Sequence, residues 1–70
     1  MNNVKLNNCI KVFRAKCNMS QKDLAEAVGV TRKTINTIEN GRFVPSTVLS
    51  LKIANFFKTA VEEIFELEEE

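Results

Sequence analysis

The sequence contains no histidine, tryptophan or tyrosine, and only two cysteines, two glycines and one proline among its 70 residues. Without histidine, the common zinc sites and most acid–base or nucleophilic enzyme centres cannot be assembled. No serine stands beside a base, and no glycine-rich loop is present to cradle a phosphate. An enzyme is therefore the least supported class, and neither a metal nor a cofactor is expected.

Long apolar runs are missing as well. No stretch approaches the roughly 18 residues that a membrane-spanning helix requires, and the first eight residues are too polar for a signal peptide. Five phenylalanines and many branched aliphatic residues can still supply one modest core. We expect a single cytoplasmic domain, residues 1–70, with no membrane association.

The two cysteines, Cys9 and Cys17, both fall on the expected first helix. Eight residues correspond to roughly 12 Å along a helix axis, which exceeds the reach of a disulfide. We interpret them as small packing residues, with a redox switch or an intersubunit bridge as the alternative.

The formal net charge of +1 conceals an uneven distribution. Residues 1–44 contain eight basic residues and three acidic ones, a formal +5, whereas residues 45–70 contain two lysines and six glutamates, a formal −4. The basic part suits a polyanionic partner. Residues 66–70, Glu-Leu-Glu-Glu-Glu, are expected to form a solvated acidic tail.

The periodicity of apolar residues predicts an all-α domain of five helices. Asn7 or Asn8 can cap the first helix, and Asn18 is a plausible left-handed stop after it. Pro45 excludes helix before it and precedes the fourth helix. Residues 59–62 read as a capping box that opens the fifth.

Three details near the ends of the chain carry further expectations. Lys58 occupies the position before the fifth helix where a glycine is expected. Residues 4–6 and 65–67 both alternate apolar and charged side chains. We therefore expect that these two segments can pair as short strands.

Residues 20–40 predict two short helices joined by a tight turn. Ser20 caps the first of the two helices, with Asp23 three residues on, and Gly29 supplies the positive φ of the turn. Thr31 caps the second helix, whose apolar residues point inward. Its outer face carries Arg32, Lys33, Asn36, Thr37 and Asn40. Such a helix fits the major groove of DNA, although an ordinary solvated face would look similar.

The same segment carries a family resemblance. It reads Ser20-Gln-x-x-Leu-Ala-x-x-x-Gly29-Val-Thr-x-x-Thr-Ile-x-x-Ile-Glu-Asn-Gly41, followed by Pro45-Ser46 and Glu62-Glu-Ile-Phe65. Over roughly residues 7–67 the chain resembles the Cro/repressor-type (XRE-like) helix-turn-helix regulators of bacteria and phages. The resemblance implies a lambda-repressor-like five-helix fold and double-stranded DNA as the partner.

The resemblance also assigns roles to individual positions. The base-reading positions are Arg32, Lys33 and Thr37, with Asn36 beside them. The phosphate-contacting positions are Gln21, Thr31, Thr34, Asn40 and Arg42. A structural ion pair is implied between Arg14 and Glu39. Family members of this small type dimerise through the fifth helix and the C-terminal segment, which places the dimer contact at Val61, Ile64, Phe65 and Leu67.

The chemistry of these side chains supports the assignment. Arg32 and Lys33 suit guanine O6 and N7, and Gln21 lies in the first turn of a helix, where phosphates bind. Thr37 is shorter than the side chain that many relatives carry there, so its reach to a base is the weakest expectation. The four dimer residues can alternatively complete the core of the monomer.

The leading hypothesis is a sequence-specific transcriptional regulator, expected to be a repressor that binds a near-palindromic operator as a homodimer. A protein-interaction module of the antitoxin or antirepressor type, built on the same fold, is the alternative. No small-molecule ligand is evident.

Overall fold

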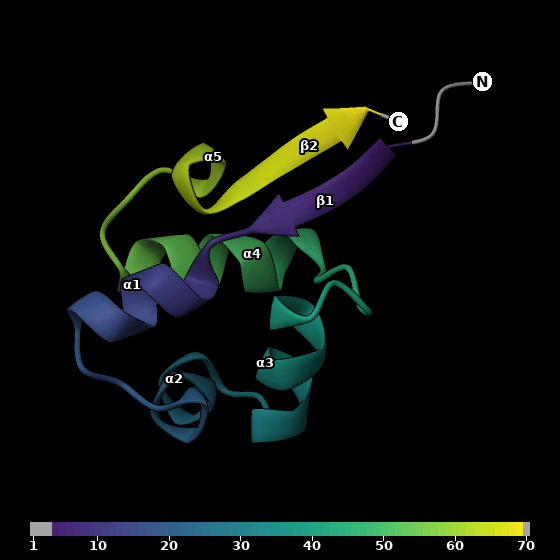
Figure 1. Cartoon of the computed structure of the whole chain (residues 1–70). Helices are drawn as coiled ribbons and strands as arrows, with labels where there is room; N and C mark the ends of the chain where they lie inside the picture. The colour runs from purple at the N-terminus through teal and green to yellow at the C-terminus, as the bar shows by residue number, and fades with distance from the viewer. Residues whose placement is uncertain (1–3, 70) are drawn as a thin grey trace.

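The computed structural model of the chain describes residues 4–69 and contains five helices and one two-stranded sheet (Figure 1). Both the helix count and the pairing of the chain ends are confirmed. The elements in order are β1 (Val4–Asn8), α1 (Ile10–Lys16), α2 (Gln21–Val28), α3 (Arg32–Glu39), α4 (Thr47–Phe56), α5 (Val61–Ile64) and β2 (Phe65–Glu69).

Polar caps define the start of the three central helices. The Ser20 hydroxyl accepts from the Asp23 backbone N–H, and the Asp23 carboxylate accepts from the Ser20 N–H, both at 3.0 Å. Thr31 caps α3 and Ser46 caps α4 in the same way, each by accepting from the N–H three residues on. These bonds satisfy backbone donors that have no partner inside the helix.

The first and last helices begin differently from the sequence-based prediction. Asn7 and Asn8 both lie in β1, and the N-cap of α1 is Cys9. The Asn8 side-chain oxygen nevertheless accepts from the first N–H of α1 at 3.2 Å. The predicted capping box at residues 59–62 is wrong, because α5 starts one residue later, after Ala60, and the Thr59 hydroxyl bonds to Glu63 instead.

A residue with positive φ lies one or two positions after the end of each of the first four helices, and the residue that follows it bonds back to a carbonyl five positions earlier. This pattern closes the last turn of a helix and redirects the chain. The positive-φ residues are Asn18 (58°), Gly29 (79°), Gly41 (73°) and Lys58 (56°). The left-handed stop predicted at Asn18 is confirmed, and Lys58 adopts the conformation that glycine favours.

The two ends of the chain pair as an antiparallel ribbon. Val4 lies opposite Glu69, Leu6 opposite Leu67 and Asn8 opposite Phe65. Residues 66–69, expected as a solvated tail, are therefore held by backbone pairing, while their side chains remain exposed. The last residue of that expected tail, Glu70, lies outside the described residues. In Figure 1 this ribbon runs along one side of α1 and α4, with α2 and α3 on the other.

One apolar core joins all of these elements. Its most buried members are Ile10, Leu24, Ala25, Val28, Ile35, Ile38, Leu49, Ile53, Ala54, Ile64 and Phe65. Leu6 of β1 packs against the core, as do Phe13 and Phe57, whose ring centroids lie 5.4 Å apart. No helix within residues 4–69 is long and apolar enough to cross a bilayer.

The conformation of Lys58 leads to a stability prediction. Because an L side chain in the left-handed region is strained, Lys58→Gly should raise the free energy of unfolding by about 0.5–1 kcal/mol. The same substitution inside α4, Lys52→Gly, should lower it by about 1 kcal/mol. Thermal unfolding followed by circular dichroism measures both changes. A lower melting temperature for Lys58→Gly would contradict the prediction.

Candidate nucleic-acid interface

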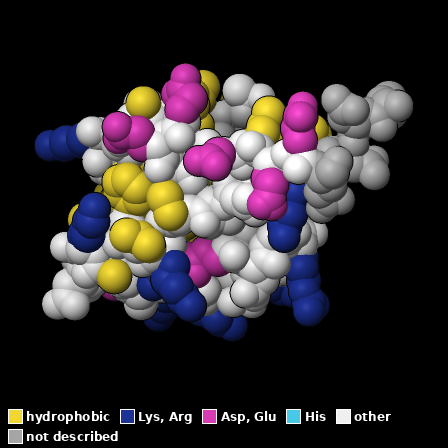
Figure 2. Space-filling model, turned by 45° about the horizontal axis from the view of Figure 1, so that its top comes forward, with side chains coloured by type: hydrophobic (Ala, Val, Ile, Leu, Met, Phe, Trp, Pro, Cys, Tyr) yellow, Lys and Arg dark blue, Asp and Glu magenta, His cyan; other side chains and the backbone are white. Residues whose placement is uncertain are grey.

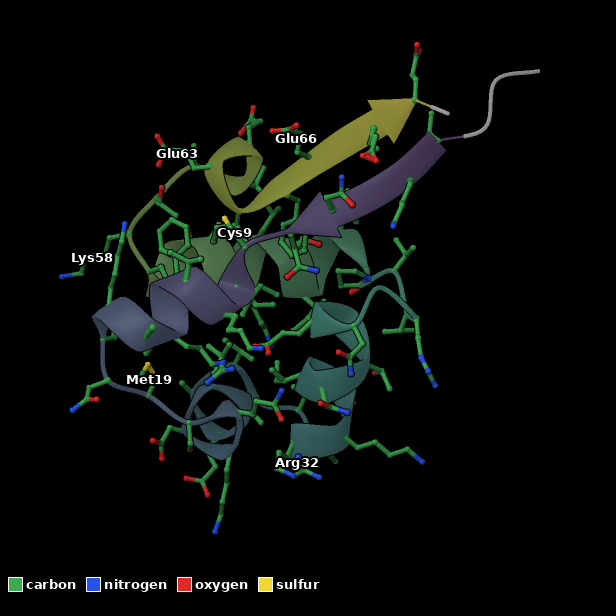
Figure 3. The ribbon with its side chains drawn as sticks, in the orientation of Figure 1. Cys9, Met19, Arg32, Lys58, Glu63 and Glu66 are labelled. Atoms are coloured by element: carbon green, nitrogen blue, oxygen red, sulfur yellow. The ribbon has the colours of Figure 1, made fainter. Side chains whose placement is uncertain are left out.

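The two faces of α3 differ sharply in exposure. Ile35 and Ile38 are 0% and 1% exposed and fix the helix in the core. Arg32 and Lys33 are exposed in the first turn, and Asn36 is half-buried one turn further on. Figure 3 shows Arg32 at the end of α3 that lies farthest from the ribbon. The helix therefore presents a polar face and a basic end to solvent.

A bidentate ion pair joins α3 to α1. Arg14 Nε lies 2.7 Å from Glu39 Oε2, and Arg14 Nη2 donates to Glu39 Oε1 at 3.0 Å. The remaining amino group, Nη1, donates to the Met19 carbonyl at 2.9 Å. Only 12% of the Arg14 side chain and 6% of the Glu39 side chain are exposed. This geometry fixes both the separation and the rotation of the two helices.

Glu39 is held in its ionised form by its neighbours. Burial acts to raise the pKa of this carboxyl, but hydrogen bonds from Arg14 and Gln21, with the positive charges of Arg14 and Lys11, outweigh it. The pKa of Glu39 therefore lies below its ordinary value. An ionised carboxylate only accepts hydrogen bonds, so each of its partners must be a donor.

Gln21 connects this ion pair to the exposed end of α3. Its amide nitrogen Nε2 lies 3.0 Å from Glu39 Oε1 and 3.2 Å from Asn36 Oδ1. Its oxygen Oε1 accepts from Arg32 Nη1 at 3.1 Å. One continuous set of bonds thus runs from Arg14 on α1, through Glu39 and Gln21, to Arg32. The Arg32 guanidinium is held by this set, and among residues 4–69 its other N–H groups have no acceptor.

The three threonines of this region bond mainly within the protein. The Thr31 hydroxyl accepts from the Thr34 N–H at 3.2 Å and lies 3.0 Å from the Thr34 hydroxyl. The Thr37 hydroxyl lies 2.9 Å from the Thr34 carbonyl and 3.0 Å from that of Lys33. Its single hydrogen is therefore used by the helix itself, and Thr37 presents no free donor.

Three further site residues predicted from the sequence are exposed. Lys33, Asn40 and Arg42 lie on the first turn of α3, at its C-terminal end and just beyond it. Within residues 4–69 the structure records no side-chain hydrogen bond for any of them. Each side chain is thus available to an external acceptor.

Asn8, predicted as a possible cap of the first helix, also makes a bond to α3 that the sequence did not indicate. Its amide nitrogen donates to the Ile38 carbonyl near the end of α3 at 2.9 Å, and its oxygen accepts from Ile10. It therefore ties β1, α1 and α3 together. The sequence indicated only an amide side chain two residues before a helix. The bond to α3 could not be predicted, because its two residues are 30 positions apart in the sequence.

The residues expected at a dimer contact separate into two groups. Ile64 and Phe65 are 2% and 8% exposed and belong to the core of the chain itself, and Val61 packs against that core. Leu67 is 67% exposed. Ile64 and Phe65 therefore complete the core of the monomer, which was the alternative to a dimer contact, because a single chain already buries them.

Charge is also divided between the two sides of the molecule. In Figure 2 most acidic side chains of the visible face lie in its upper part, and basic side chains lie along its lower edge and at its left side. The glutamates of this acidic region are Glu62, Glu63, Glu66, Glu68 and Glu69. The first turn of α3 therefore carries the positive charges of Arg32 and Lys33, whereas five glutamates lie on α5 and β2. Asp23 and Glu26 are two further exposed carboxylates, on α2.

Residues 10–64 match the family model described as helix-turn-helix. The chain belongs to the helix-turn-helix family. The match covers every helix of the structure and includes the whole polar face of α3.

Two HTH-type transcriptional regulators are similar to this chain along nearly their whole length, and a phage protein is similar over about half of its length. YgzD of Bacillus subtilis, named as an HTH-type transcriptional regulator, is 48% identical over 65 residues, which are 93% of this chain and 98% of YgzD. MJ0272 of Methanocaldococcus jannaschii, with the same type of name, is 45% identical over equal shares. A 10 kDa protein of the ImmF control region of Bacillus phage phi105 is 40% identical over 50 residues, 71% of this chain and 56% of the phage protein.

Solved structures show the same helix-turn-helix fold. The transcriptional regulator VanUg matches 100% of this chain and 93% of its own, with a TM-score of 0.76 at 24% identity. The clp gene regulator ClgR of Corynebacterium glutamicum matches 77% of this chain and 57% of its own, with a TM-score of 0.71 at 26% identity.

The ion pair predicts how stability depends on pH. A carboxyl whose pKa is lowered by folding stabilises the protein above its unfolded pKa, and this contribution is lost as the pH falls through its folded pKa. Glu39→Gln should therefore lower the free energy of unfolding by about 1–3 kcal/mol at pH 7. This loss should become smaller between about pH 5 and pH 3, as Glu39 of the wild type is protonated.

Urea unfolding at a series of pH values measures this difference. The matched control is Glu26→Gln, which removes a carboxylate from an exposed position on α2 and should change stability by less than about 0.5 kcal/mol. If the difference in unfolding free energy between wild type and Glu39→Gln stays constant from pH 7 to pH 3, the charge of Glu39 is not the source of the stabilisation.

Proposed function

We propose that this chain is a sequence-specific DNA-binding transcriptional regulator that acts in the cytoplasm as a repressor. It places α3 in the major groove of double-stranded DNA. Arg32 and Lys33 contact base edges there, with Asn36 and Thr37 beside them. The phosphate backbone is contacted by Gln21, Thr31, Thr34, Asn40 and Arg42.

The observation that carries this proposal is the bonded set from Arg14 to Arg32. A solvated surface arginine has no need of a defined position, yet Arg32 is held at 3.1 Å by a glutamine that an ionised carboxylate orients. Base recognition requires such order, because each bond to a base edge has a fixed direction. The names of YgzD and MJ0272 as transcriptional regulators support the same conclusion.

The separation of charge supports the mode of binding. The basic side attracts the phosphate backbone, and the acidic α5 and β2 side disfavours the opposite orientation. The protein therefore approaches DNA with α3 leading. Occupation of successive major grooves would block other proteins from the same stretch of DNA, which favours repression.

Two arginine substitutions separate the roles assigned to α3 and to the residue beyond it. Arg32→Ala should weaken binding to the preferred duplex by about 1–3 kcal/mol and relax the preference at one base position. Arg42→Ala should weaken binding to all sequences alike and reduce the slope of log affinity against log salt by about one per protomer. Selection from random duplexes and salt titrations give both quantities.

Lys58→Ala is the matched control, because it also removes one positive charge and leaves the same left-handed conformation. Figure 3 places Lys58 far from Arg32, on the other side of the molecule. The Lys58→Ala variant should bind the preferred duplex with the same affinity as wild type. Selection of no motif by wild type would refute the function and favour the protein-interaction alternative.

We propose further that the regulator is a homodimer bound to a near-palindromic operator. Two copies related by a twofold axis would place their α3 helices about 34 Å apart, one turn of DNA. Exposed apolar side chains are available for the contact. They are Leu67, predicted from the sequence, Val44 just before α4 (67% exposed), and Val48 and Leu51 in the first half of α4 (64% and 47% exposed). Val61 can contribute from the edge of the core.

A charge placed in the dimer contact should separate the protomers. Leu67→Glu and Val48→Glu should each raise the dimer dissociation constant by about tenfold or more, since burying an unpaired carboxylate in an apolar interface is costly. Val12→Glu, on the exposed part of α1, is the control and should leave it unchanged. Sedimentation equilibrium measures the three constants. Dimer dissociation constants equal to that of wild type for both Leu67→Glu and Val48→Glu would contradict the proposed contact.

A further inference from the structure

We propose that Asn36 recognises guanine through its amide N–H groups alone, and that Glu39 sets this preference through Gln21. The proposal rests on the DNA-reading function proposed above and defines which base pair that function selects. A free asparagine favours adenine, because its oxygen and nitrogen bond to adenine N6 and N7 together. Here the asparagine is not free.

The direction of each amide follows from the carboxylate. Glu39 accepts hydrogen bonds only, so the Gln21 atom 3.0 Å from its Oε1 must be the nitrogen Nε2. The same Nε2 lies 3.2 Å from Asn36, which must therefore offer its oxygen Oδ1. Gln21 Oε1 is left on the other side and receives Arg32 at 3.1 Å. All three contacts agree with one arrangement.

This arrangement leaves Asn36 with donors to offer. Its Oδ1 is directed at Gln21, and within residues 4–69 its nitrogen Nδ2 has no acceptor. While Oδ1 stays bonded to Gln21, the oxygen and the nitrogen of the Asn36 amide cannot both bond to the same base. The neighbouring basic side chains extend the same character, since Arg32 and Lys33 carry donors only. The Thr37 hydroxyl differs from them, because it donates its single hydrogen to its own helix and offers no donor to a base.

Side chains that offer only donors, as Asn36, Arg32 and Lys33 do here, match a base edge that offers only acceptors. In the major groove guanine presents two adjacent acceptors, O6 and N7, whereas adenine places the N6 donor beside N7. An amide fixed with Nδ2 outward would face the adenine N6 group donor to donor. The position read by Asn36 should therefore be a G·C pair in preference to an A·T pair.

The test uses the full chain and duplexes selected from a random pool. Asn36→Ala first identifies the base position that Asn36 reads, as the one position where this variant loses preference. Wild type should bind the duplex with G·C at that position about 5- to 150-fold more tightly than the one with A·T. Gln21→Met keeps the length of the side chain and removes both of its polar atoms, so it releases the Asn36 amide. This variant should lose the G·C preference or shift to A·T.

Lys22→Met is the matched control, because Lys22 is the exposed neighbour of Gln21 on α2; this variant should keep the G·C preference. An A·T preference in wild type, no position affected by Asn36→Ala, or an unchanged G·C preference in a folded Gln21→Met would each overturn the proposal. If Gln21→Met does not fold by circular dichroism, wild type and Asn36→Ala alone decide. Selection of no motif at all would instead refute the proposed function.

Discussion

The carboxylate of Glu39 is the group on which the arrangement of the helices depends. It stands at the end of α3 and accepts from Arg14 of α1 and from Gln21 of α2. Apolar burial holds these helices together, but it is non-directional and tolerates rotation and sliding. The charged hydrogen bonds have fixed directions, and losing one partner would leave a desolvated charge. The core thus decides which face of α3 is buried, and the bonds of Glu39 fix the rotation of α3 relative to α1 and α2.

The connections between helices depend on geometry more than on residue type. Four of the five helices close with a left-handed residue, and only Gly29 and Gly41 are glycines. Asn18 adopts this conformation with modest strain because short polar side chains tolerate it, whereas Lys58 has no such advantage. The backbone bonds that close each turn, such as that from Thr59 to the Ala54 carbonyl, compensate for the strain. The compact turns keep α2 and α3 in the close arrangement that exposes Arg32.

Local signals were enough to predict most of the fold from the sequence. Ser20, Asp23 and Thr31 act within one helical turn, so their caps could be predicted, and the alternating ends indicated the paired strands. The start of α5 was missed because two glutamates follow Thr59 within reach, and the Thr59 hydroxyl bonds to Glu63 and not to Glu62. The candidate site was only partly predictable. The outward face of α3 follows from periodicity, whereas the bonds of Gln21 and Asn8 join residues 15 to 30 positions apart and need the folded chain.

The hydrogen bonds of Glu39 and Gln21 contribute both to stability and to the proposed base recognition, and this limits which residues can be substituted at these two positions. Gln21 and Glu39 are inside the structural network, yet they determine which atoms Asn36 and Arg32 offer to a partner. A substitution at either position would alter stability and base preference together, because an amide that loses its donor contact is free to turn. Lys33, Asn40 and Arg42 lie outside this network. A new base preference is therefore easiest to obtain at Lys33, where a changed side chain leaves the orientation of α3 intact. Changes at Asn40 and Arg42, which are proposed to contact phosphates, should instead alter the affinity for all sequences alike.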